Sequence, residues 1–143
     1  METIAPILAR KQPHFNSILS GCTLRDALNK MNCENSVYLI VVNDNENFLG
    51  LLTEHDITTN IMLGRKPAEK IIVDDLMNKN LPVASSHDTV ERCIKLMCQH
   101  HIHQIPVFDE YEFKGIICAD DLLQEVAVMR NEVFDDEKEA AIY

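Results

Sequence analysis

Two short turns carry the side chains with the clearest chemical potential, Thr53-Glu-His-Asp56 and Cys118-Ala-Asp-Asp121. A carboxylate at the start of a helix can accept hydrogen bonds from both hydroxyls of a ribose, each worth roughly 1.5–3 kcal/mol. A hydroxyl and free backbone N–H groups in the same turn suit a phosphate, because a helix N-terminus carries partial positive charge. Thr53 and Asp56 are therefore candidates for the two ends of a nucleoside phosphate. The alternative role of Asp56 is to cap its helix.

The two turns belong to an internal repeat. Residues 50–57 (GLLTEHDI) align with residues 115–122 (GIICADDL) at an offset of 65, which pairs Gly with Gly and Asp with Asp. The same offset places residues 38–42 over residues 103–107. Self-similarity of this kind indicates two copies of one supersecondary unit.

The repeat extends upstream with one slip. Residues 23–24 align with residues 89–90 at an offset of 66, which predicts a one-residue insertion or deletion between helix and strand. The GRKP segment at 64–67 is the predicted joint between the copies. The predicted divisions are a first repeat with an N-terminal extension at 1–66, a second repeat at 67–128 and an acidic tail at 129–143.

Each copy is predicted to form a helix, a β-hairpin and a second helix after a leading extended segment. Apolar residues recur at i, i+3, i+4 and i+7 from Leu24 and from Val90, the pattern of a helix with one buried face. Asp88 and Glu91 stand where an N-cap and its capping-box partner belong.

Polar turns at 43–47 and 109–112 separate the predicted hairpin strands, and the second helices start near Asp56 and Asp121. One such unit leaves the apolar faces of a small sheet and two helices uncovered, so we expect the second copy to cover them. The predicted fold class is α+β, with two tandem repeats packed by pseudo-twofold symmetry.

Composition narrows the functional classes. Lys and Arg total 13 against 23 Asp and Glu, and the formal net charge of −10 opposes binding to nucleic acid. No apolar run approaches the roughly 18 residues that span a bilayer, so we expect no membrane insertion. Five cysteines form an odd set without C-x-x-C spacing, which favours reduced thiols and a cytoplasmic location.

The second copy contains a Met-containing leading segment, a helix-opening Thr-Val pair, a Pro-Val strand and a Gly-apolar-apolar-Ser/Thr-x-x-Asp turn, at residues 73–83, 89–90, 101–107 and 115–122. In their order and spacing these four stretches closely resemble a CBS (cystathionine-β-synthase) repeat. The first copy keeps the last motif in full, but Val41 stands in place of Pro106 and its leading segment at 10–19 lacks the Met-Thr-like signature. The resemblance spans roughly residues 10 to 128.

The resemblance implies a stand-alone Bateman-type regulatory module that catalyses nothing. Such modules have two clefts between their repeats, pair as homodimers, sense adenosine compounds and signal to a separate partner protein. The implied ligands are AMP, ADP, ATP or S-adenosylmethionine, and no cofactor or metal is required. The alternative function is a ligand-free dimerisation scaffold of the same fold.

The resemblance also assigns residues to the two clefts. The preferred nucleotide site comprises Thr53, His55, Asp56, Asn78, Leu81, Ile102 and His103. The second site comprises Val37, Tyr38, Cys118 and Asp121. Here a Cys replaces the hydroxyl and Asp120 would repel a phosphate, so we expect this cleft to be empty or to take an uncharged or cationic adenosine derivative.

Two other clusters suggest enzymes. His100, His101 and His103 could bind a metal, but they lack a matching second ligand pair. Residues 85–88 (SSHD) contain a hydrolase set, yet neighbours in sequence rarely converge as nucleophile, base and orienting group. We interpret the first cluster as a helix end and the second as a turn and cap, and keep a small metal-dependent or hydrolytic enzyme as a third alternative.

Overall fold

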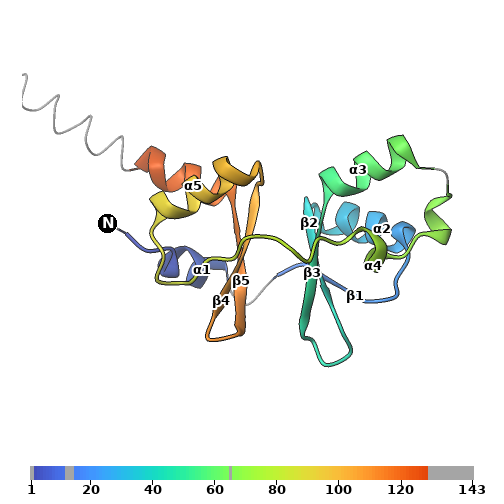
Figure 1. The fold of residues 1–143 in the computed structure, drawn as a ribbon, viewed down its shortest axis with the longest axis horizontal. Helices are drawn as coiled ribbons and strands as arrows, with labels where there is room; N and C mark the ends of the chain where they lie inside the picture. Colours follow the sequence, from blue (N-terminus) through green and yellow to red (C-terminus); the bar gives the residue numbers. More distant parts are fainter. Residues whose placement is uncertain (1, 12–14, 65, 129–143) are drawn as a thin grey trace, which may run out of the picture. The chain divides into compact units, whose positions relative to one another are not determined.

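The computed structural model describes residues 2–11, 15–64 and 66–128, and these form two compact units. One unit contains residues 15–81, and the other contains residues 2–11 together with 82–128. In each unit the helices lie on one face of a small sheet (Figure 1). The α+β prediction is confirmed, whereas the predicted acidic tail at 129–143 lies outside the described residues.

The unit of residues 15–81 is built on a three-stranded sheet in the order β1-β2-β3. β1 pairs with β2 in parallel, and β2 pairs with β3 as an antiparallel hairpin. Its elements are β1 (Ser17–Leu19), α2 (Leu24–Glu34), β2 (Tyr38–Val42), β3 (Phe48–Thr53), α3 (Glu54–Leu63), the 3-10 helix η1 (Ala68–Lys70) and α4 (Val73–Leu76).

The other unit repeats this pattern around the antiparallel β4–β5 hairpin. Its leading strand is reduced to a single parallel bridge between Ala84 and Val107. Its elements are α1 (Ala5–Lys11), α5 (Val90–His100), β4 (Gln104–Asp109), β5 (Glu112–Cys118) and a helix over 119–128.

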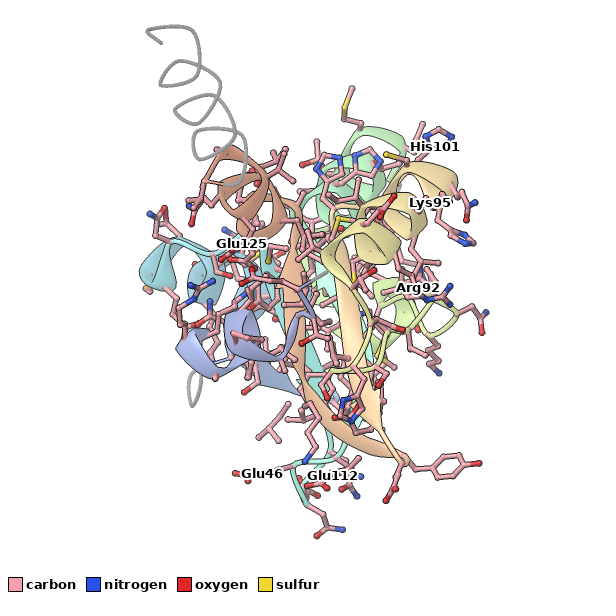
Figure 2. The ribbon with its side chains drawn as sticks, turned by 90° about the vertical axis from the view of Figure 1, so that its left-hand side faces the viewer. Glu46, Arg92, Lys95, His101, Glu112 and Glu125 are labelled. Atoms are coloured by element: carbon pink, nitrogen blue, oxygen red, sulfur yellow. The ribbon has the colours of Figure 1, made fainter. Side chains whose placement is uncertain are left out.

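Threonine caps begin the first helix of each repeat. Thr23 and Thr89 accept N–H donations at the start of α2 and α5. The predicted cap at Asp88 is wrong, because its carboxylate accepts the N–H of Ser85 at 2.8 Å and so closes the preceding turn. Both helices end at a left-handed residue, and in α5 this residue is His101 at the end of the helix (Figure 2).

The two hairpins differ in length at the turn. Ile40 pairs with Leu51, and Pro106 pairs with Ile116. The second strands therefore match at an offset of 65 and the first strands at 66. The predicted position of the one-residue slip, between helix and strand, is wrong; the slip falls in the hairpin turn. Pro106 consequently corresponds to Ile40 and not to Val41.

The leading segments change places between the repeats. The N–H of Val73 donates to the carbonyl of Cys22 at 2.9 Å, and the N–H of Ile4 donates to Asp88 at 2.9 Å. Cys22 and Asp88 are equivalent positions, so residues 2–11 are the structural counterpart of the segment around Val73. The predicted repeat boundaries stay a prediction, but each compact unit combines one repeat with the other repeat's leading segment.

Burial explains why each exchanged segment stays packed against its unit. Val73 is fully buried in the core of residues 15–81, together with Leu24, Leu39 and Leu52. Ile4 is equally buried in the other unit. Removal of such apolar surface from water is the main force that fastens each segment to its unit.

Candidate functional site

The Thr53–Asp56 turn lies where β3 passes into α3 and is closed by a capping box. The Asp56 N–H donates to Thr53 Oγ1 at 3.2 Å, and Asp56 Oδ2 accepts the Thr53 N–H at 3.1 Å. The Thr53 hydroxyl also donates to Asp56 Oδ2, at 2.7 Å. Asp56 is thus the third residue of α3 and Thr53 is its N-cap. A hydroxyl carries one proton, so Thr53 must leave Asp56 before it can donate to a ligand.

Asp56 keeps one carboxylate oxygen available. None of the described residues donates to Oδ1, and the side chain is half-buried. Asp56 also lines a hollow of about 320 Å³ within the same unit. The hollow is lined by residues of α3, its C-cap and α4, namely His55, Asp56, Thr59, Asn60, Leu63, Gly64, Asp75 and Leu76. Two carboxylates and one exposed imidazole set its charge.

Asn78 belongs to the same unit but uses its polar groups locally. Its N–H donates to the Leu51 carbonyl at 2.8 Å, and the Leu51 N–H donates back at 3.1 Å. Its side-chain oxygen accepts the N–H of Asn80 at 2.9 Å. A Cβ on Gly50 would come within 3.2 Å of the Asn78 carbonyl, so the motif's glycine lets the segment pass close to β3. Leu81 is half-buried at the end of this unit.

Ile102 and His103 belong to the other unit. The Ile102 N–H donates to Met97 at the end of α5, and the His103 carbonyl accepts the N–H of Ala119 at 2.8 Å. Four of the seven residues predicted for the preferred site, Thr53, His55, Asp56 and Asn78, thus lie at the α3 start or the segment paired with β3. The complete seven-residue site stays a prediction.

The Cys118–Asp121 turn has the same backbone hydrogen bond to its aspartate, but a lysine side chain also binds there. The Cys118 N–H donates to Asp121 Oδ2 at 2.8 Å. The ammonium of Lys11, from the end of α1, donates to the same oxygen at 2.7 Å and approaches Cys118 Sγ at 3.6 Å. Burial raises the pKa of the Cys118 thiol, and the Lys11 charge opposes that rise.

The structure corrects the repeat alignment at Val37 and Tyr38, while their place in the second site stays a prediction. The Val37 carbonyl accepts the N–H of Glu54 at 2.8 Å, as the His103 carbonyl accepts that of Ala119. Val37, not Tyr38, is therefore the counterpart of His103, and the predicted equivalence was wrong by one residue. The Tyr38 side chain is only 7% exposed, whereas that of Val37 is half exposed.

Sequence reasoning missed Lys11, Asp75, Thr59 and Asn60. Asp75 lies in the leading segment of the second repeat. Knowledge that the leading segments change places would have assigned Asp75 to the unit that contains Thr53 and Asp56. Lys11 carried no motif signal, because its partner Asp121 is brought to it only by folding. Among the described residues no group of three or more His, Cys, Asp or Glu could hold a metal ion. None of the described helices combines the length and the apolar character that a bilayer crossing requires.

Comparison with known proteins agrees with the repeated architecture. The family model for the CBS domain matches twice, at residues 9–63 and 73–128. The chain belongs to the CBS domain family. The protein YlbB of Bacillus subtilis is 31% identical over 110 residues, which are 73% of each chain. A homoserine O-acetyltransferase of Methanococcus vannielii is 25% identical over 116 residues, or 80% of this chain and 23% of the enzyme.

The chain spans between 15% and 44% of the length of the first curated relatives that it matches. Among solved structures, the CBS domain NE2398 superposes with a TM-score of 0.81 at 25% identity, over 89% of this CBS chain and 99% of the other. CBSX2 in complex with AMP gives 0.73 at 18% identity, covering 91% and 99%. The CBS pair of MJ0100, in complex with 5′-methylthioadenosine and S-adenosylmethionine, gives 0.74 at 19% identity, covering 90% and 98%.

Proposed function

We propose that this CBS pair is a non-catalytic regulatory module that binds an adenosine-containing ligand through the Thr53–Asp56 turn and signals to a separate protein in the cytoplasm. AMP, ADP, ATP and S-adenosylmethionine are the ligands to test. The proposal is supported by the AMP and S-adenosylmethionine complexes of the structural neighbours. Regulation would then follow from different ligand affinities in two states of the module.

One observation carries the proposal. Asp56 Oδ2 is held by the capping box, which orients the carboxylate, while Oδ1 receives no donor from the described residues, and Asp56 lines a hollow. Ribose hydroxyls are suitable donors for such an oxygen. Because Asp75 also lines the hollow, the ribose and base should contribute more to affinity than the phosphate.

The test is a calorimetric titration with AMP, ADP, ATP and S-adenosylmethionine, in which Asp56→Ala is compared with Asp26→Ala. Asp26 closes an equivalent capping box with Thr23 at the start of α2, with the same 3.1 and 3.2 Å bonds. Both variants lose a helix cap, but only Asp56→Ala removes the proposed ligand oxygen. We expect binding to be lost in Asp56→Ala and kept in Asp26→Ala.

Equal loss of binding in both variants would assign the effect to helix stability and contradict the proposed site. The absence of heat and of any thermal shift with every ligand would contradict ligand sensing altogether. Retained binding in Asp56→Ala, together with loss in Asp121→Ala, would move the site to the other turn.

The second candidate function is a ligand-free scaffold that acts through homodimerisation. It is favoured by the apolar end of α3, where Ile61, Met62 and Leu63 are 54%, 80% and 77% exposed. Apolar side chains grouped in this way commonly mark a protein interface. Sedimentation of the wild type beside Met62→Glu tests it: a dimer that the charge dissociates supports the scaffold, and a wild-type monomer excludes it.

A further inference from the structure

Lys11 is held at the Cys118–Asp121 turn by three acceptors. Its ammonium donates to Asp121 Oδ2 at 2.7 Å and to the carbonyl of Ile116 at 2.9 Å, and it lies 3.6 Å from Cys118 Sγ. The Lys11 and Asp121 side chains are only 21% and 23% exposed. An ammonium has three N–H donors, and each of these is directed to an acceptor within one unit.

The ammonium replaces two donors of the equivalent turn. In the unit of residues 15–81, the Thr53 hydroxyl donates to Asp56 Oδ2 at the same 2.7 Å. There the carbonyl of Leu51, the counterpart of Ile116, accepts the N–H of Asn78. The second repeat has Cys118 in place of the threonine, and Lys11 satisfies both acceptors. With its donors used in this way, Lys11 is a poor partner for a ligand phosphate.

Neighbouring contacts keep Lys11 in place. Arg10 forms an ion pair with Glu125, which lies on the side of the 119–128 helix facing α1 (Figure 2). Ile7 and Leu8 of α1 are each 4% exposed. A ribose that used both oxygens of Asp121 would have to displace the ammonium from Oδ2 and leave a half-buried charge without its carboxylate, which is unfavourable. At Asp56 the same step moves only the neutral Thr53 hydroxyl.

We propose that Lys11 is the residue that decides which of the two turns binds the adenosine ligand. It occupies the Cys118–Asp121 turn as an internal cation, so the chain binds one ligand at the Thr53–Asp56 turn. Replacing Lys11 by a neutral side chain makes the Cys118–Asp121 turn available to the ligand. This inference rests on the proposed function for the nature of the ligand.

The test is a titration of Lys11→Met and Arg10→Met in the Asp56→Ala background, which removes the first site. The probe is 5′-methylthioadenosine, which has both ribose hydroxyls and no phosphate for Asp120 to repel. We expect Lys11→Met to restore binding at least about tenfold over Asp56→Ala alone. Arg10→Met removes a charge from the same helix but leaves Asp121 paired, so it should restore none. Thermal melts confirm that both variants fold.

The outcomes separate the two proposals. Restoration by Lys11→Met that a further Asp121→Ala change removes supports the inference, even if the wild type binds nothing and the proposed function fails. A wild type that binds at Asp56, with no restoration by Lys11→Met, overturns the inference and leaves the proposed function standing. Wild-type binding that Asp121→Ala or Lys11→Met abolishes overturns it too, because Lys11 would then belong to a working ligand site.

Discussion

The backbone N–H of Ile4 donates to the carbonyl oxygen of Asp88 at 2.9 Å, which joins the beginning of the chain to the second repeat. An isolated bridge between Thr3 and Thr89 and a bond from the Val90 N–H to Glu2 continue the contact. The first residues are therefore part of the unit of residues 82–128. They complete the core of the repeat that follows far downstream in the sequence.

Ile4→Ala should accordingly destabilise the unit that contains the second repeat. Ile4 is completely buried, and truncation of a buried Ile to Ala costs about 2–5 kcal/mol. Urea unfolding monitored by circular dichroism measures the free energy of unfolding. Ile61→Ala, at a position that is 54% exposed, is the matched control and should change that free energy by less than about 0.5 kcal/mol. A loss of unfolding free energy in Ile4→Ala no larger than that in Ile61→Ala would show that residues 2–11 are not packed against the second repeat.

Thr53→Ala should lower stability by about 1 kcal/mol, because it removes the N-cap of α3. Thr53→Ser retains the hydroxyl that accepts from the Asp56 N–H and should restore most of the loss. Chemical denaturation of the three proteins without ligand gives the comparison. A Thr53→Ala protein as stable as the wild type would mean that the capping box contributes nothing, and the orientation of Asp56 would need another cause.

Much of the fold could be predicted because the helices and hairpins of each repeat follow local patterns of apolar and polar residues. Leu24 and Val90 begin helices in the places predicted by their periodicity, and the hairpins follow. The strand register could not be predicted with one residue's accuracy, because the apolar run at 38–42 reads equally well at offsets 65 and 66. The pairings of Ile40 with Leu51 and of Pro106 with Ile116 together resolve it.

The candidate site could be predicted only within one turn. Thr53 and Asp56 are three residues apart, so sequence alone brings them together, and the structure shows them in hydrogen-bond contact. Lys11 and Asp121 meet through the exchange of leading segments, a tertiary event with no local signal. The sequence suggested that the second turn is degenerate because of Cys118, but not that a lysine compensates for that cysteine.

Gly50→Ala should destabilise the contact between β3 and the segment after α4. The new Cβ would lie 2.9 Å from Met77 Sδ and 3.2 Å from the Asn78 carbonyl, and overpacking of this kind costs about 1–3 kcal/mol. Combination with Met77→Ala should relieve the sulfur clash. The double variant should therefore lose at least about 0.5 kcal/mol less than the sum of the single losses. Strictly additive losses would indicate that Met77 is not the obstacle.

Cys93 should make stability fall as the pH rises above 9. Burial raises the pKa of this thiol from 9.0 to about 11, with a smaller contribution from the Asp88 carboxylate. Between these two values the unfolded chain has lost a proton that the folded chain keeps, so deprotonation favours unfolding. Below pH 9 both states hold the proton and the contribution is complete; it disappears as the pH passes through 11.

The measurement is the free energy of unfolding of the wild type and Cys93→Ala from pH 8 to 11. The variant loses packing at every pH, because the Cys93 side chain is fully buried, so only the difference in slope is informative. Its curve should fall less steeply above pH 9 than that of the wild type. Cys33→Ala, which removes an exposed thiol, is the matched control. If the wild-type and Cys93→Ala curves run parallel to pH 11, the buried thiol does not control the alkaline limit of stability.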